Sequence, residues 1–227
     1  MKTTIAALVI LAGSALAFVP QQWASRSCIA LQASDFANPE TLPGALPPVG
    51  FWDPAGFAKD ANAAVVKKYR EAELQHGRVA MLAALGLLVT EEPIEYHPLF
   101  EAGVKDIGPA IRHLDEVRAV SPFFFEILAV IIGTLELNRA LKGWEPEDFM
   151  LKDDYYPGDV GFDPLGLKPT DPQELEIMQT KELQNGRLAM LGAAGMIAQE
   201  LVNGKEIFVN LGLAQDRFNP TDLPVQF

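Results

Sequence analysis

A duplicated segment constrains the fold of this chain more than any other feature of its sequence. In each copy an Asp-Pro turn is followed by a core of the form Glu-x-x-(His/Asn)-Gly-Arg-x-Ala-Met-Leu. The turns begin at Asp53 and Asp163, 110 residues apart, and the cores begin at Glu73 and Glu182, 109 residues apart. A period of this length does not suit a solenoid array. It favours a helical unit duplicated around a third element.

Each copy reads as a turn followed by a long helix. Asp-Pro-x-Gly is typical of turns, and the residues that follow are rich in the good helix formers Ala, Leu, Met and Glu. We predict helices over 61–91, ended by Pro93, and over 172–203, ended by Asn203-Gly204. An apolar stretch predicts a middle helix over 122–143. The polar segments between the three helices are expected to be surface connections.

The composition excludes several classes of function. With 18 Lys and Arg against 30 Asp and Glu, the net charge is −12, which argues against a nucleic-acid partner. The single cysteine, Cys28, excludes a disulfide framework and any cysteine-based zinc or iron–sulfur site. Three histidines leave little for metal or general-base chemistry. The composition therefore disfavours several classes of enzyme.

The first 34 residues are expected to be a targeting leader. Residues 1–17 have a positive start, a short apolar run and a small-x-small cleavage site, which predicts a signal peptide. Residues 18–34 contain serine and arginine but no acidic residue, which is typical of a plastid transit segment. Together they resemble the two-part leader of algae whose plastid lies inside the endomembrane system. An ordinary secreted protein with a flexible N-terminus is the alternative.

Hydropathy alone does not identify three membrane spans. The uncharged apolar runs of the outer helices cover only 79–90 and 188–198. A spanning helix usually shows roughly 18–20 apolar residues. A soluble helical bundle is therefore an open alternative at this level, and the placement of the charges decides against it.

Helical geometry places the charges of each copy on different faces. Glu73 and His76 share a face, whereas Arg78 lies about 140° away from Glu73. The second copy repeats this spacing with Glu182, Asn185 and Arg187. Because each arginine points away from the glutamate of its own helix, we expect it to pair across the two helices. The expected crossed pairs are Glu73 with Arg187 and Glu182 with Arg78.

These pairs make a membrane location plausible in physical terms. Paired charges inside a bundle are tolerated in hydrocarbon, where isolated ones are prohibitive. Gly77 and Gly186 lie where a small residue lets two helices approach closely. An odd number of spans makes the first and third helices run in the same direction. We predict an all-α membrane protein with three transmembrane helices, the first and third forming a crossed pseudo-twofold pair.

Each ion pair leaves nitrogen or oxygen atoms available as ligands. The magnesium of a chlorophyll is a hard ion that needs one axial nitrogen or oxygen donor. A carboxylate that an arginine already neutralises supplies this donor without adding net charge to the bilayer. With the duplicated core and both Asp-Pro turns, the sequence resembles the light-harvesting chlorophyll-binding family. Its leader and acidic loops are similar to the fucoxanthin–chlorophyll a/c branch of diatoms and related algae.

The resemblance implies a chlorophyll-binding three-helix membrane domain over 35–227 and specific pigment ligands. The implied axial ligands are Glu73, His76, Glu136, Glu182, Asn185 and Gln199. The arginines that pair with ligands are Arg78, Arg139 and Arg187. Thr90, which corresponds to Gln199, is not a convincing ligand, and Glu126 has no assignable position. His97 and His113 are expected to be surface residues.

The implied function is not an enzyme but a light-harvesting antenna that binds chlorophyll a, chlorophyll c and a fucoxanthin-type carotenoid in the plastid thylakoid membrane. It passes excitation energy to a photosystem core and contacts neighbouring antenna subunits and thylakoid lipids. The segment 155–167 resembles members beside photosystem I. Basic residues early in the first helix and acidic ones at its end favour a stromal N-terminus.

Two other functions are open from the sequence. Photoprotective quenching occurs in some members of the same family, and the residues do not separate it from light harvesting. A di-iron carboxylate enzyme also uses Glu-x-x-His on a helical bundle, but it needs two copies of that motif. Here the second copy reads Glu182-x-x-Asn185.

Overall fold

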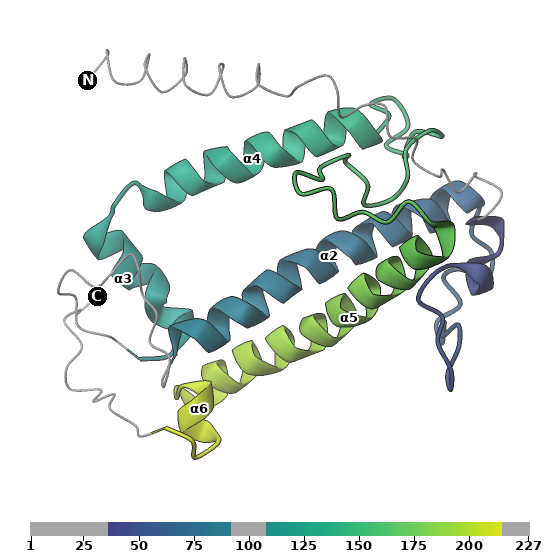
Figure 1. Cartoon of the computed structure of the whole chain (residues 1–227). Helices are drawn as coiled ribbons and strands as arrows, with labels where there is room; N and C mark the ends of the chain where they lie inside the picture. The colour runs from purple at the N-terminus through teal and green to yellow at the C-terminus, as the bar shows by residue number, and fades with distance from the viewer. Residues whose placement is uncertain (1–35, 92–107, 215–227) are drawn as a thin grey trace, which may run out of the picture.

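The computed structural model describes residues 36–91 and 108–214. Over these residues the chain is helical, and its only extended pairings are isolated bridges (Figure 1). The elements are η3 (Pro39–Thr41), α2 (Ala63–Thr90), η4 (Ala110–Arg112), α3 (His113–Val120), α4 (Phe124–Gly143), α5 (Pro172–Asn203) and α6 (Ile207–Asn210). The three long helices therefore lie where the sequence predicts helices, with starts that differ by at most two residues.

The ends of α5 show why the sequence signals work. The Asp171 side chain accepts a hydrogen bond from the Glu174 N–H, and Pro172 occupies the first helical position. At the other end Gly204 has a φ of +62°, which glycine adopts without strain, and its N–H donates to the Glu200 carbonyl.

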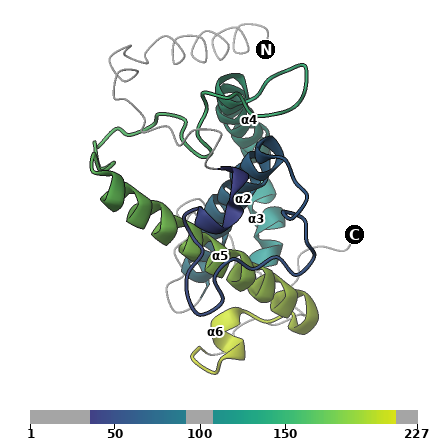
Figure 2. The same ribbon diagram turned by 90° about the vertical axis from the view of Figure 1, so that its right-hand side faces the viewer.

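The helices α2 and α5 pack side by side through two glycines. A Cβ atom added to Gly77 would lie 3.0 Å from the Cα of Gly186, and one added to Gly186 would lie 3.0 Å from the Cα of Gly77. The backbones therefore touch without intervening side chains. In both views α2 lies between α4 and α5 (Figure 1, Figure 2), so the middle helix is attached to the first copy of the duplication.

The long helices expose much of their apolar surface. Leu82 of α2, Leu135 of α4 and Leu191 of α5 are 73%, 65% and 77% exposed. The buried cluster of Phe36, Leu42 and Val66 is small by comparison. Exposed apolar surface of this extent indicates that the helices contact lipid, cofactor or another chain.

Hydropathy does not single out a span among the described helices. Each one taken alone is too short or too polar to pass as a membrane-crossing segment. One bent combination passes on length and composition, formed by Ala110–Val120 with Phe124–Gly143 at an angle of 109°.

The predicted connection before the middle helix is partly helical. Its described part contains η4 and α3, whereas the polarity of the segment predicts a surface loop. His113 is also not a surface residue, because it is only 9% exposed and its Nε2 lies 3.1 Å from the Gly108 carbonyl oxygen. Packing of this short amphipathic helix, rather than its polarity, sets the burial of His113. His97 and the predicted leader segments 1–17 and 18–34 lie outside the described residues.

Candidate functional site

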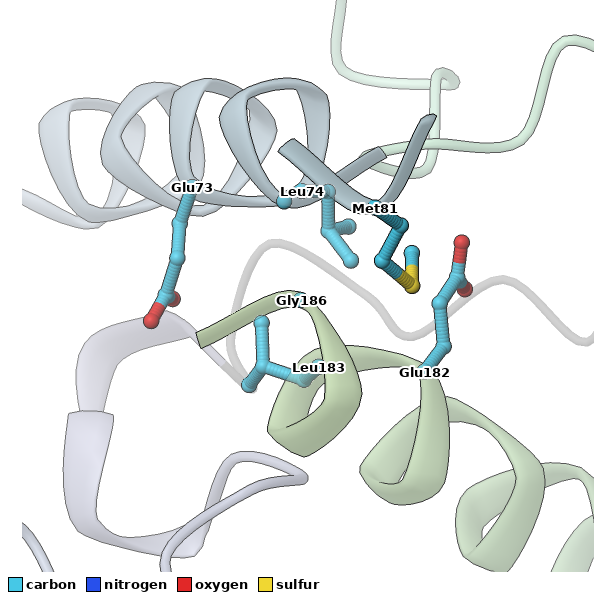
Figure 3. A pocket seen from close by; sticks show the side chains of 7 residues that line it. Glu73, Leu74, Met81, Glu182, Leu183 and Gly186 are labelled. Atoms are coloured by element: carbon cyan, nitrogen blue, oxygen red, sulfur yellow. The ribbon is translucent and has the colours of Figure 1, made fainter. Parts of the chain in front are cut away.

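Two ion pairs join α2 to α5 on either side of the glycine contact. Arg78 Nε donates to Glu182 Oε1 at 2.7 Å, and Arg187 Nε donates to Glu73 Oε1 at 2.8 Å. Figure 3 shows Glu73 reaching from α2 and Glu182 reaching from α5, with Gly186 between them. Each arginine therefore neutralises the glutamate of the other copy.

The arginines are also held by the loops that precede the two helices. Arg78 NH1 donates to the Gly158 carbonyl at 2.9 Å, and Arg187 NH1 donates to the Gly44 carbonyl at 2.8 Å. Gly44 and Gly158 have φ values of +102° and +81°, where an L side chain is strained. Sequence reasoning missed these partners, although each follows a proline ahead of an Asp-Pro turn. The duplication therefore extends beyond the helices into both loops.

His76 and Asn185 occupy equivalent positions and make the same local bond. His76 Nδ1 lies 2.7 Å from the Ala72 carbonyl oxygen, and Asn185 Nδ2 donates to the Lys181 carbonyl at 2.8 Å. A carbonyl oxygen only accepts, so the proton of a neutral His76 is on Nδ1 and the Nε2 lone pair is free. For Asn185 the corresponding free atom is Oδ1. Both side chains are exposed, so each copy presents one donor atom at its surface.

The two paired glutamates differ in their second oxygen. Glu73 Oε2 lies 3.4 Å from Arg70 NH1, so two cations face this carboxylate. Glu182 has only the ion pair with Arg78 among the described contacts. The first copy therefore holds its glutamate with more positive charge than the second.

The middle helix carries its own ion pair. Arg139 Nε and NH2 donate to Glu136 Oε2 at 3.0 and 2.7 Å, as expected for residues three apart. Two residues of α2 that sequence reasoning missed join this pair. Gln75 Nε2 donates to Glu136 Oε1 at 2.9 Å, and Arg139 NH1 donates to Glu71 Oε1 at 2.8 Å. Glu71 lies two residues before Glu73, where the duplicated core begins. An acidic residue just ahead of this core was the sequence signal that could have identified it.

The structure also places the remaining candidate ligand. Gln199 is half-buried on α5, and its buried Nε2 has no hydrogen-bond partner within the described residues. At the corresponding position of α2, the Thr90 hydroxyl donates to the Gly86 carbonyl at 2.9 Å. The two copies thus differ at this level, as their sequences indicate.

A pair of buried glutamates closes the opposite end of α2 and α5. Glu91 Oε2 accepts the Ile207 N–H at 2.7 Å, and Glu200 Oε2 accepts the Ile111 N–H at 2.9 Å. Both residues are 1% exposed, and each Oε1 has no partner within the described residues. Glu91 follows the last residue of α2.

Burial raises the pKa of Glu91 to about 7. The hydrogen bond from the Ile207 backbone opposes this rise, whereas the neighbouring carboxyl groups of Glu200 and Glu206 add to it. Two buried carboxylates cannot donate to each other, but one proton turns them into a hydrogen-bonded pair. One proton shared by the pair would therefore give the two unpartnered Oε1 atoms a hydrogen bond.

Together these features define a class of helical protein that holds cofactors between apolar surfaces. Its carboxylates are neutralised between helices, and its nitrogen and oxygen donors are exposed on them. The sequence pattern of the Chlorophyll A-B binding protein family matches residues 38–201. The chain belongs to this family, and the family membership expected from the sequence is confirmed. The family has a helical membrane fold, and its members are light-harvesting, pigment-binding proteins rather than a class of enzyme.

Relatives of this chain include stress-related light-harvesting proteins and fucoxanthin-chlorophyll a-c binding proteins. The chain is 49% identical over 183 residues to light-harvesting complex stress-related protein 3.2 of Chlamydomonas reinhardtii, covering 78% of this chain and 70% of the relative. It is also 49% identical over 171 residues to a fucoxanthin-chlorophyll a-c binding protein of Isochrysis galbana, covering 72% of this chain and 77% of the relative. A fucoxanthin-chlorophyll a-c binding protein of Trieres chinensis is 35% identical over 90% of this chain and 96% of the relative. All three relatives are described as chloroplastic.

Proposed function

We propose that this chain is a light-harvesting antenna of the thylakoid membrane that binds chlorophyll a, chlorophyll c and a fucoxanthin-type carotenoid. It passes excitation energy to a photosystem core, directly or through neighbouring antenna subunits. In this proposal α2, α4 and α5 span the membrane, with α2 and α5 as a crossed pseudo-twofold pair. The segments 1–17 and 18–34 serve as the leader that directs the protein into the plastid.

The observation that carries the proposal is the matched pair of His76 and Asn185. Each side chain is oriented by a bond to the carbonyl four residues earlier, and each leaves one nitrogen or oxygen donor exposed. A magnesium ion in a tetrapyrrole takes one such donor. The same arrangement in both copies supports a shared ligand role, because packing alone does not require a free donor on an exposed helix face.

The glutamates fit the same role. Glu73, Glu182 and Glu136 are each bonded to an arginine, so a carboxylate oxygen can bind magnesium without leaving an unpaired charge in lipid. We assign these three residues, His76, Asn185 and Gln199 as the axial chlorophyll ligands, with Arg78, Arg139 and Arg187 as their pairing residues. The bound pigments supply the light absorption, and the protein sets their spacing and orientation.

Sequence features support the orientation and the photosystem included in this proposal. Lys67, Lys68 and Arg70 lie near the start of α2, and Glu91 follows its end. By the positive-inside rule this distribution supports a stromal N-terminus. The likeness of the segment 155–167 to members beside photosystem I supports that photosystem as the acceptor.

Photoprotective quenching is the second candidate. It is favoured by 49% identity to relatives named as stress-related. The two roles differ in what happens to the excitation, so the fluorescence lifetime of the purified pigmented protein separates them. An antenna keeps a long lifetime at neutral and acidic pH, whereas a quencher acquires a short one under its activating condition.

The ligand assignment is tested by refolding the protein with chlorophyll a, chlorophyll c and fucoxanthin, then measuring the absorption spectrum and extracted pigments. His76→Leu should lose one chlorophyll per chain with the helical content unchanged. His76→Asn, which copies the donor of the second repeat, should retain the chlorophyll. A colourless wild-type protein, or full chlorophyll content in both His76→Leu and Asn185→Leu, contradicts the proposal.

A further inference from the structure

The carboxylate of Glu136 is held from two helices at once. Its Oε2 accepts two hydrogen bonds from Arg139, the residue one helical turn later on α4. Its Oε1 accepts one hydrogen bond from Gln75 Nε2 on α2, at 2.9 Å. The carboxylate plane is therefore fixed by donors on both sides, whereas Arg139 alone would leave Oε1 free to rotate with the side chain.

The guanidinium that holds this carboxylate is shared with a second carboxylate. Arg139 bonds both Glu136 and Glu71, so one guanidinium faces two carboxylates. Glu71 is 2% exposed and its oxygens also accept the Gly158 N–H at 2.6 Å and the Tyr155 hydroxyl at 3.3 Å. Glu71 is thus held by donors from α4 and from the loop before α5, whereas the side chain of Glu136 is 43% exposed and has Arg139 and Gln75 as its described donors.

We infer that Gln75 is a positioning residue for the chlorophyll site of α4, a role that rests on the proposed ligand function of Glu136. Its amide N–H occupies one lone pair of Oε1 and leaves the other to face an electropositive magnesium centre. Glu71 assists by holding Arg139 from the opposite side, so that the guanidinium cannot swing onto Oε1. Donors that orient a ligand in this way change the affinity of a metal site without touching the metal.

The second copy supplies a matched control. Gln184 stands 109 residues after Gln75, but its Nε2 donates to the Gly44 carbonyl at 3.0 Å and not to a carboxylate. Both glutamines bridge from a long helix to another part of the chain, and both are half-buried. Removing either one costs a hydrogen bond, yet only Gln75 touches a candidate ligand.

The test compares Gln75→Leu, Gln184→Leu and Glu136→Leu in the full chain refolded with chlorophyll a, chlorophyll c and fucoxanthin. The spectrum of the wild type minus that of Glu136→Leu identifies the band of the α4 chlorophyll. Gln75→Leu should shift this band and weaken binding of that chlorophyll about tenfold. Gln184→Leu should leave the band in place. In the Glu136→Leu background, Gln75→Leu should cause no further pigment loss.

A second readout separates positioning from simple stabilisation. The thermal midpoint of helix loss, followed by far-ultraviolet circular dichroism, should fall by similar amounts in Gln75→Leu and Gln184→Leu, because each loses one hydrogen bond. An unshifted band with full occupancy in Gln75→Leu, or an equal band shift in Gln184→Leu, overturns the inference. Full chlorophyll content in Glu136→Leu instead contradicts the ligand role of Glu136 and so the proposed function at this site.

Discussion

The two copies of the duplication build the same contacts around one glycine pair, but of their two long helices only α2, from the first copy, bonds the ion pair of the middle helix in the described part of the chain. Both copies contribute an arginine that bonds the other copy's glutamate and a loop carbonyl. Both contribute a donor residue oriented by the carbonyl four residues earlier. These contacts repeat because each needs only residues that were duplicated together.

The difference lies one turn ahead of the shared core. The first copy has Arg70 and Glu71, which bond Glu73 and the arginine of the α4 ion pair. The second copy has Gln179 and Thr180 at the corresponding positions. The middle helix occurs only once in the chain, so it can dock on only one of the two equivalent helix faces. The residues that both copies share hold α2 and α5 together. A few residues that differ between the copies determine which of the two helices α4 contacts.

The largest expected effect comes from breaking one crossed ion pair. Arg78→Leu leaves Glu182 without its only described cation and should lower the free energy of unfolding by about 3 kcal/mol, the low end for a buried pair, because both side chains are about a third exposed. Arg187→Leu should cost less, because Arg70 remains 3.4 Å from Glu73. Thermal unfolding of the detergent-solubilised pigmented protein measures both. Equal losses, or a larger loss in Arg187→Leu, would show that the two copies are not held as described.

A smaller and symmetric effect is expected at the glycine contact. Gly77→Ala and Gly186→Ala should each destabilise by about 2 kcal/mol, because the added methyl group meets backbone atoms of the facing helix at 3.0 Å. Gly86→Ala is the control, since a Cβ there meets nothing within 4 Å. It should stabilise α2 by up to about 1 kcal/mol. The same unfolding experiment measures all three, and unequal losses at the two contact positions would contradict a reciprocal contact.

The smallest effect concerns the carboxyl pair at the other end of the two helices. Because the pKa of Glu91 is raised to about 7 in the folded protein, the folded state binds more protons than the unfolded state above the ordinary glutamate pKa. Stability is therefore greatest at acidic pH and falls as the pH rises through 7. Between pH 6 and pH 7.5 the free energy of unfolding should fall by about 1 kcal/mol.

Removing either carboxyl group of the pair tests this pH dependence. Glu91→Gln and Glu200→Gln each remove one carboxyl group from the pair, so either variant should flatten the profile between pH 6 and pH 7.5. Glu145→Gln, a change in an exposed loop residue, should leave it as in the wild type. A wild-type profile that rises over this range would show that the pair is ionised when folded.

Local signals in the sequence account for the long helices. Pro172 and Gly204 mark the two ends of α5, and the residues between them are mostly good helix formers. The pairing of Glu73 with Arg187 follows equally from the sequence, because helical angles and the duplication leave few other partners for these charges. The short helix α3 and the burial of His113 were not predicted, since the polarity of a connecting segment does not indicate which of its side chains its packing will bury.

Duplication, spacing and residue type therefore establish the family and the long helices, and they supply the residues proposed here as magnesium ligands. The chain's three-dimensional packing establishes what those residues touch. Gln75 and Gln184 both follow a Glu-Leu pair at the same place in the duplicated core, yet one bonds Glu136 and the other a loop carbonyl. Side-chain partners of this kind depend on where a third helix docks, and a contact between segments 61 residues apart leaves no mark on the local sequence of either one.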